Sequence, residues 1–138
     1  MLGIDTNVLV RYLVRDDEAQ FEKASRLIKR EVGAGEPVFV SLPLLLETEW
    51  VLRSRYALKK PEIAAVISGL LDATEIQFEA EPAIEESLKL WKNSAANFAD
   101  CLIGAHNRRL GCQATATFDV KAAKLPHFSA AKRGALRL

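Results

Sequence analysis

The chain has 138 residues, of which 49% are apolar and 27% are charged, a composition typical of one soluble globular domain. Lys and Arg number 19 against 18 Asp and Glu, which excludes a binder that depends on overall positive charge and leaves only a local patch for nucleic acid. No apolar run approaches the ~18 residues of a membrane helix, and the first residues lack the charged segment and cleavage pattern of a secretory signal. The sequence therefore predicts a cytoplasmic protein.

A short apolar run at residues 2–4 opens the chain and predicts a buried strand. Asp5 follows this run directly and precedes residues 7–14, whose apolar residues recur at helical spacing. Asp5 is therefore either the N-cap of this helix, where Asp is favoured, or a cation ligand at the carboxyl end of the strand. Asp16 or Asp17 then caps a second helix, whose apolar face is expected to carry Phe21, Ala24, Leu27, Ile28 and Val32.

The rest of the chain alternates between strand and helix patterns. Strands are predicted at residues 38–40, 75–79 and 112–117, and helices at residues 17–33, 41–56, 61–72, 82–91 and 97–110. The order strand, helix, helix, strand implies a parallel sheet with crossover helices, and therefore an α/β fold. Since no repeat, low-complexity stretch or linker divides the chain, one domain is expected over residues 1–138.

Glu47 is the first of three further acids in informative positions. It falls on the apolar face of the helix at residues 41–56, on the same side as Trp50, whereas Glu49 is expected to face solvent. A glutamate on an apolar face is costly unless it is paired, protonated or bound to metal. The alternative is a glutamate at the rim that reaches water and pairs with Arg53 or Arg11.

Asp100 and Asp119 are placed at the ends of predicted elements. Asp100 lies in the first turn of a helix that Asn97 opens, where the helix dipole favours negative charge, and Asp119 follows the last predicted strand as Asp5 follows the first. In a doubly wound sheet the carboxyl ends of strands and the amino ends of helices share one edge, so the acids can converge. Two carboxylates ~4 Å apart repel by about 4 kcal/mol at an effective dielectric near 20. A cluster of them would hold protons unless a cation neutralised it.

Carboxylates without paired Cys or His ligands favour Mg²⁺ or Mn²⁺ over zinc. His106 and His127 are isolated and show no zinc-type spacing, so neither is expected to be a ligand. A carboxylate-held ion suits phosphodiester hydrolysis, while no Ser-His-Asp or Cys-His set offers a competing nucleophile and no Gly-rich loop indicates a nucleoside triphosphatase. Cys101 and Cys112 are expected to be reduced core residues.

Four segments in order carry a resemblance to a known family. They are Asp5-Thr6-Asn7, Glu47 with Trp50-Val51-Leu52-Arg53 behind it, Phe98-Ala99-Asp100-Cys101-Leu102-Ile103, and Thr117-Phe118-Asp119. Over nearly its whole length the chain resembles the PIN domain and, more narrowly, the VapC-type toxins of toxin–antitoxin pairs. The resemblance implies a three-layer α/β/α sandwich with a central parallel sheet and a Mg²⁺- or Mn²⁺-dependent endoribonuclease. It also implies a homodimer that a cognate antitoxin silences.

Carried over by position, the resemblance implies one catalytic and metal-binding quartet: Asp5, Glu47, Asp100 and Asp119. Asn7 would steady Asp5 by a hydrogen bond, and Thr117 would place its hydroxyl beside the quartet. Relatives often have an acid where this chain has Asn97. An amide there keeps a carbonyl oxygen but lacks charge, which weakens the case for a second tightly held ion.

Basic residues near the acids are the candidates for RNA binding, foremost Arg11, Arg53 and Lys121. The wider set adds Arg15, Arg55, Arg108, Arg109 and Lys124. The large aromatic residues are expected in the core rather than as platforms for stacked bases: Trp50, Trp91, Phe98 and Phe118.

Two other functions stay open beside the toxin. One is a metal-dependent nuclease of RNA maturation or DNA repair that has no antitoxin, and the other is a binding module whose site Asn97 marks as degraded. If an antitoxin exists, it is expected to lie across the acids and present an Arg to their carboxylates. The very apolar helix at residues 61–72 either fills the core or contacts a second copy or a partner.

Overall fold

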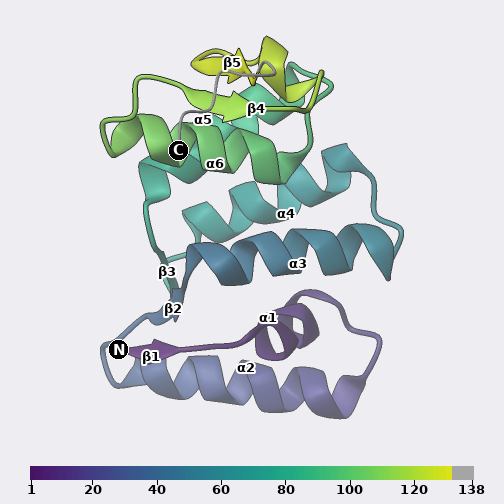
Figure 1. Cartoon of the computed structure of the whole chain (residues 1–138). Coiled ribbons are helices and arrows are strands. Elements are labelled where there is room, and N and C mark those ends of the chain that lie inside the picture. The colour runs from purple at the N-terminus through teal and green to yellow at the C-terminus, as the bar shows by residue number, and fades with distance from the viewer. Residues whose placement is uncertain (132–138) are drawn as a thin grey trace. The chain divides into compact units, whose positions relative to one another are not determined.

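The computed structural model describes residues 1–131, in which strands and helices alternate along the chain (Figure 1). The chain divides into two compact units, Met1–Glu79 and Ala80 onward, which are described separately. The predicted α/β class with a parallel sheet is confirmed. Among the helices of the described residues, none combines the length and apolarity that crossing a bilayer requires.

The first unit holds a three-stranded parallel sheet. Its strands are β1 (Leu2–Gly3), β2 (Val38–Val40) and β3 (Ile76–Phe78), in the order β1-β2-β3. The register sets Val38 opposite both Leu2 and Ile76. Val38 and Val40 of the central strand are fully buried, as expected for a strand with neighbours on both sides.

Two pairs of helices make the crossovers that parallel strands require. Helices α1 (Thr6–Leu13) and α2 (Glu18–Gly33) connect β1 to β2, and α3 (Leu42–Ser54) and α4 (Lys60–Asp72) connect β2 to β3. The N-caps of three of them are the side chains that the sequence favours there: Asp5, Asp17 and Ser41.

Helix α4 uses its apolar face inside the first unit. Ile63, Ile67 and Leu70 are buried, and the opposite side of the helix exposes small or polar residues such as Ala65 and Ser68. The structure therefore assigns this face to the core, one of the two alternatives left open by the sequence. A charge placed at Leu70 would disrupt packing and could not report on subunit contact.

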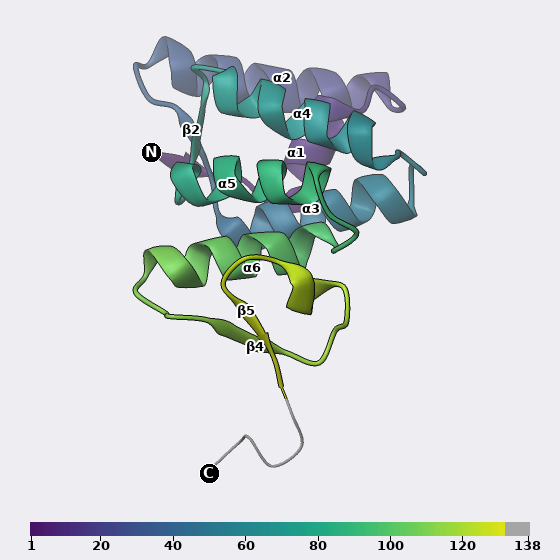
Figure 2. The ribbon, with the colours of Figure 1, turned by 90° about the horizontal axis from the view of Figure 1, so that it is seen from above.

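The second unit consists of α5 (Glu81–Lys92), α6 (Phe98–Arg109), β4 (Thr115–Thr117), the 3₁₀ turn η1 (Ala122–Lys124) and β5 (Phe128–Ala130). Helices α5 and α6 pack together, with the Trp91 and Phe98 rings 5.1 Å apart between centroids. Figure 2 shows β4 and β5 side by side next to α6. The two strands are parallel, with Thr115 opposite Phe128.

Three expectations at the ends of elements were wrong. Strand β4 begins at Thr115 rather than at residue 112, so Cys112 is exposed and only Cys101 is a core residue. Strand β5 was not anticipated, because residues 118–127 form a shorter crossover than parallel strands usually need. Val32, expected on the buried face of α2, is exposed near the end of that helix.

Candidate functional site

Asp5 lies between β1 and α1, where its side chain caps the helix. Its Oδ1 accepts a hydrogen bond from the Val8 N–H at 3.0 Å, which confirms the N-cap interpretation. A carboxylate has a second oxygen and further lone pairs, so capping leaves Asp5 able to bind a cation. The side chain is exposed. The hydrogen bond from Asn7 to Asp5 stays a prediction.

On helix α3 the expectation that Glu49 faces solvent was wrong, and the exposure of Glu47 agrees with the alternative of a glutamate that reaches water. Glu49 is only 3% exposed, whereas Glu47 is exposed together with Trp50. Leu45, Glu49 and Leu52 recur at i, i+4 and i+7 and form the most buried stripe of a helix that is apolar around much of its circumference. Glu49 is tolerated there because its Oε2 accepts a 2.8 Å hydrogen bond from Arg53 Nε.

Glu47 lines a hollow of about 240 Å³ between α1 and α3. Its walls are largely polar and include Asn7, Arg11, Glu47, Trp50, Arg55 and Tyr56. Within the first unit, therefore, Asn7 and Glu47 face a common space.

Arg11 is fixed in the wall of this hollow by a three-residue network. Its Nη1 donates to the two carboxylate oxygens of Asp16, at 3.0 and 3.2 Å, and to the Tyr56 hydroxyl at 3.2 Å. The Tyr56 hydroxyl in turn donates to Asp16 Oδ2 at 3.0 Å. The hydrogen bond from Tyr56, assisted by Arg11, lowers the pKa of the Asp16 carboxyl. Arg11 thus connects α1 to Tyr56, which follows the end of α3.

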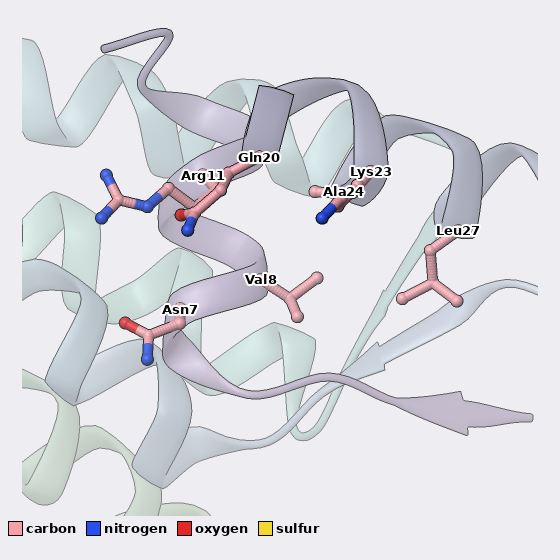
Figure 3. A pocket seen from close by; sticks show the side chains of 7 residues that line it. All are labelled: Asn7, Val8, Arg11, Gln20, Lys23, Ala24 and Leu27. Atoms are coloured by element: carbon pink, nitrogen blue, oxygen red, sulfur yellow. The ribbon is translucent and has the colours of Figure 1, made fainter. Parts of the chain in front are cut away.

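A second hollow, of about 330 Å³, lies between α1 and α2 (Figure 3). Val8, Ala24 and Leu27 give it apolar walls, and Asn7 and Arg11 line it as they line the first hollow. Figure 3 shows the Asn7 and Arg11 side chains extending to the same side of α1, away from Val8. These two residues form the border shared by the two hollows.

Asp100 and Asp119, in the second unit, are held by hydrogen bonds at the ends of elements. Asn97 caps α6, with its Oδ1 accepting the Asp100 N–H at 2.8 Å. Asp119 accepts the Ala122 N–H at 2.8 Å, and its own N–H donates to the Thr117 Oγ1 at 3.0 Å. The hydroxyl of Thr117 therefore lies directly beside Asp119.

The two carboxyls share an electrostatic environment. Burial raises the pKa of the Asp100 carboxyl, and the charge of Asp119 raises it further, while a hydrogen bond with Asn97 acts in the opposite direction. Asp100 is partly buried and Asp119 is exposed, and a cation bound beside them would stabilise the charge of Asp100.

Donor chemistry decides which cation fits. All the candidate ligands are hard oxygens, which suit Mg²⁺ or Mn²⁺. Over residues 1–131, the structure shows no group of three or more His, Cys, Asp or Glu side chains placed to hold a metal ion. Of the four acids expected as ligands, Asp5 and Glu47 belong to the first unit, and Asp100 and Asp119 to the second.

The position of Asp100 leads to a prediction about pH. Because the folded-state pKa of Asp100 is raised, its ionisation penalises the folded protein. The contribution of Asp100 to stability should fall as pH rises from the usual aspartate pKa of about 3.9 through the raised value, and stay lower above it. Asp100→Asn should therefore raise the urea midpoint at pH 7 in EDTA, and the gain should disappear in acid. An Asn variant that is no more stable than wild type at pH 7 would contradict this.

The basic residues expected to bind RNA differ in whether their side chains are already paired within the protein. Arg11 is engaged by Asp16 and Tyr56, and Arg53 by Glu49, whereas Lys121 is exposed and forms no ion pair with any residue of the described range. A direct role in RNA binding stays a prediction for all three.

The expectation that large aromatic residues lie in the core holds for half of them. Trp91 and Phe98 are buried, but Trp50 is 49% exposed and Phe118 is 79% exposed. Phe118 is exposed because it lies where the chain leaves β4, between Thr117 and Asp119. Trp50 shares the exposed face of α3 with Glu47.

Comparison with known proteins identifies a matching family and a similar protein. Residues 3–127 match the family model described as the PIN domain. A protein of Aquifex aeolicus (strain VF5) named VapC ribonuclease is 25% identical over 122 residues, which cover 88% of this chain and 90% of that relative. The matched range of the family model spans both units and includes all four acids.

Proposed function

This chain belongs to the PIN-domain family, and on that premise we propose that it is an endoribonuclease that hydrolyses RNA phosphodiester bonds with Mg²⁺ or Mn²⁺. Members of this family are in general metal-dependent nucleases, and the relative from Aquifex aeolicus is named a ribonuclease. The observation that carries the proposal is the pair Asp100 and Asp119, two carboxylates held close enough for the charge of one to raise the pKa of the other. A bound cation would offset the effect of the Asp119 charge on Asp100.

The residues proposed as ligands of the cation are Asp5, Glu47, Asp100 and Asp119. The whole chain is then a single nuclease domain, which the family match across both units supports. The bound ion would activate water and stabilise charge on the phosphate.

The residues around the four acids orient them in this proposal. Thr117 fixes the backbone of Asp119, and Asn97 fixes the start of α6. The Oδ1 of Asn97 accepts the Asp100 N–H, so the proposal gives Asn97 the role of a support for Asp100.

Metal binding is the test of this proposal. At a Mg²⁺ or Mn²⁺ concentration of 100 times Kd, wild type should gain about 2.7 kcal/mol of stability, measured by thermal or urea unfolding. RNA cleavage should stop in EDTA and return with either ion. Asp100→Asn should lose both responses, while Glu85→Gln, which removes an exposed acid on α5, should keep both. Equal stabilisation of wild type and Asp100→Asn would refute the proposed site.

The biological setting we propose is a toxin–antitoxin pair, in which the chain cuts cytoplasmic RNA as a homodimer until an antitoxin blocks it. The name of the Aquifex aeolicus relative supports this choice over a nuclease of RNA maturation or DNA repair. The antitoxin is expected to offer an Arg to the acids, where a guanidinium could take the place of the cation. Co-purification with a small neighbouring gene product, and competition between that product and Mg²⁺, would support a toxin–antitoxin pair over a nuclease without an antitoxin. Intact folding with no cleavage under Mn²⁺ would instead indicate a degraded site that only binds.

A further inference from the structure

The hollow between α1 and α3 contains groups that metal-dependent hydrolysis does not use. We propose that it is a nucleotide subsite, in which Trp50 stacks on one base of single-stranded RNA and Arg55 contacts a neighbouring phosphate. The inference rests on the proposed ribonuclease function and deepens it, because it identifies what would select the substrate.

Trp50 is the first reason. About half of its surface, 49%, is exposed, and it lines the hollow together with Tyr56. An indole left half in water gives up much of the stabilisation that burial would provide. Aromatic side chains in such positions are the usual platforms for bases of single-stranded RNA.

Arg55 is the second reason. It is exposed at the end of α3, lines the hollow, and makes no ion pair with another described residue. Most other arginines of the chain are paired with acids: Arg11, Arg15, Arg26, Arg53, Arg108 and Arg109. An unpaired guanidinium beside an aromatic ring suits a phosphate next to a stacked base.

The hollow is also preformed. The network of Arg11, Asp16 and Tyr56 fixes the wall opposite α3, so binding a base would require little ordering of side chains. Its volume of about 240 Å³ is smaller than pockets for drug-sized ligands, which begin near roughly 300 Å³, and fits one base better than a whole nucleotide.

The spacing along α3 places this subsite beside the proposed chemistry. Trp50 and Arg55 follow Glu47 by three and eight residues, which correspond to about 4.5 and 12 Å of rise along the helix. A base held by Trp50 would therefore belong to a nucleotide close to the cleaved bond. The consequence is a base requirement at one fixed position relative to the cut.

The test uses wild-type protein in EDTA and a short single-stranded RNA in which one base at a time is removed to leave an abasic site. Affinity should fall about 5- to 150-fold at one position and little elsewhere. Trp50→Ala should bind the intact RNA that much more weakly and be indifferent to removal of that base, while Trp50→Phe should keep most of the effect. If base removal weakens Trp50→Ala and wild type equally, the inference is wrong.

Arg55 is tested by salt dependence, with Arg30 as a matched control. Arg30 is likewise exposed and without an ion pair in the described range, but it lies on α2 outside this hollow. Arg55→Gln should reduce the slope of log K against log[salt] by about 0.7, the value of one phosphate contact on a single strand, and Arg30→Gln should not. Equal slopes for Arg55→Gln and wild type would overturn the assignment.

These outcomes separate the inference from the proposed function. If wild type cuts RNA with Mg²⁺ but tolerates every abasic position equally, the subsite is refuted and the nuclease stands. If wild type neither binds nor cuts RNA, the proposed function itself fails. If Trp50→Ala binds RNA normally and loses only a protein partner, the hollow is a protein contact and the subsite is refuted.

Discussion

Asp5→Asn is expected to slow metal-dependent RNA cleavage by about 10²–10³-fold, because an ion held by carboxylates contributes several kcal/mol to the transition state. The substitution removes charge but keeps an oxygen that can accept the Val8 N–H, and Asn caps helices about as well as Asp. The free energy of unfolding in EDTA should therefore change by less than about 0.5 kcal/mol. Single-turnover cleavage and urea unfolding measure the two effects separately.

Asp17→Asn is the matched control. Asp17 caps α2 as Asp5 caps α1, with its Oδ1 accepting the Gln20 N–H at 3.1 Å, but it is not one of the four acids. Cleavage by Asp17→Asn should equal that of wild type. If the two variants lose activity to the same extent, the loss comes from helix capping, and Asp5 has no role at a metal ion.

Gly104→Ala should destabilise the protein by about 1–3 kcal/mol, a typical cost of overpacking. A Cβ at Gly104 on α6 would overlap the ring of Phe128 on β5. Replacing Gly by Ala inside a helix gains up to about 1 kcal/mol of helix propensity. The overlap with Phe128 is expected to cost more than this gain. Urea unfolding monitored by circular dichroism gives the change.

Gly69→Ala is the comparison that isolates the ring contact. Gly69 lies inside α4, and a Cβ there meets no atom within 4 Å. This variant should be more stable than wild type by about 0.5–1 kcal/mol. In a double-mutant cycle, Phe128→Ala should remove most of the penalty of Gly104→Ala. If the effects of Gly104→Ala and Phe128→Ala on stability were additive, the overlap with Phe128 would not be the cause of the Gly104→Ala penalty.

Much of the architecture follows from local sequence signals. Asp5, Asp17, Ser41 and Asn97 each place an acceptor three residues before a backbone N–H at the start of a helix, and the structure shows every one of these caps. Strand β2 follows from three apolar residues that include two β-branched valines. These features depend on neighbours in the chain, which a sequence displays directly.

Other features depend on packing between elements, and there sequence reasoning failed. Periodicity could not select the buried stripe of α3, because apolar residues occur around much of that helix, so Glu49 was wrongly expected to face solvent. Strand β5 has a weak apolar pattern of its own and is defined by its pairing with β4.

The candidate site shows the same division. Its acids are recognisable at the ends of elements, and the charge of Asp119 raises the pKa of the Asp100 carboxyl, for which burial is the larger cause. Trp50 and Arg55, by contrast, gain significance only from the hollow that they line, which no spacing in the sequence reveals.

Asp5 and Asp119 each keep one oxygen engaged with the backbone, so these side chains are anchored whether or not an ion is present. Zinc fingers, by comparison, unfold when their metal is taken away. In this protein, departure of a cation should leave the first helix and the turn after β4 intact. Chelation would then act as a reversible off switch, and activity should return at the pace of ion exchange rather than of refolding.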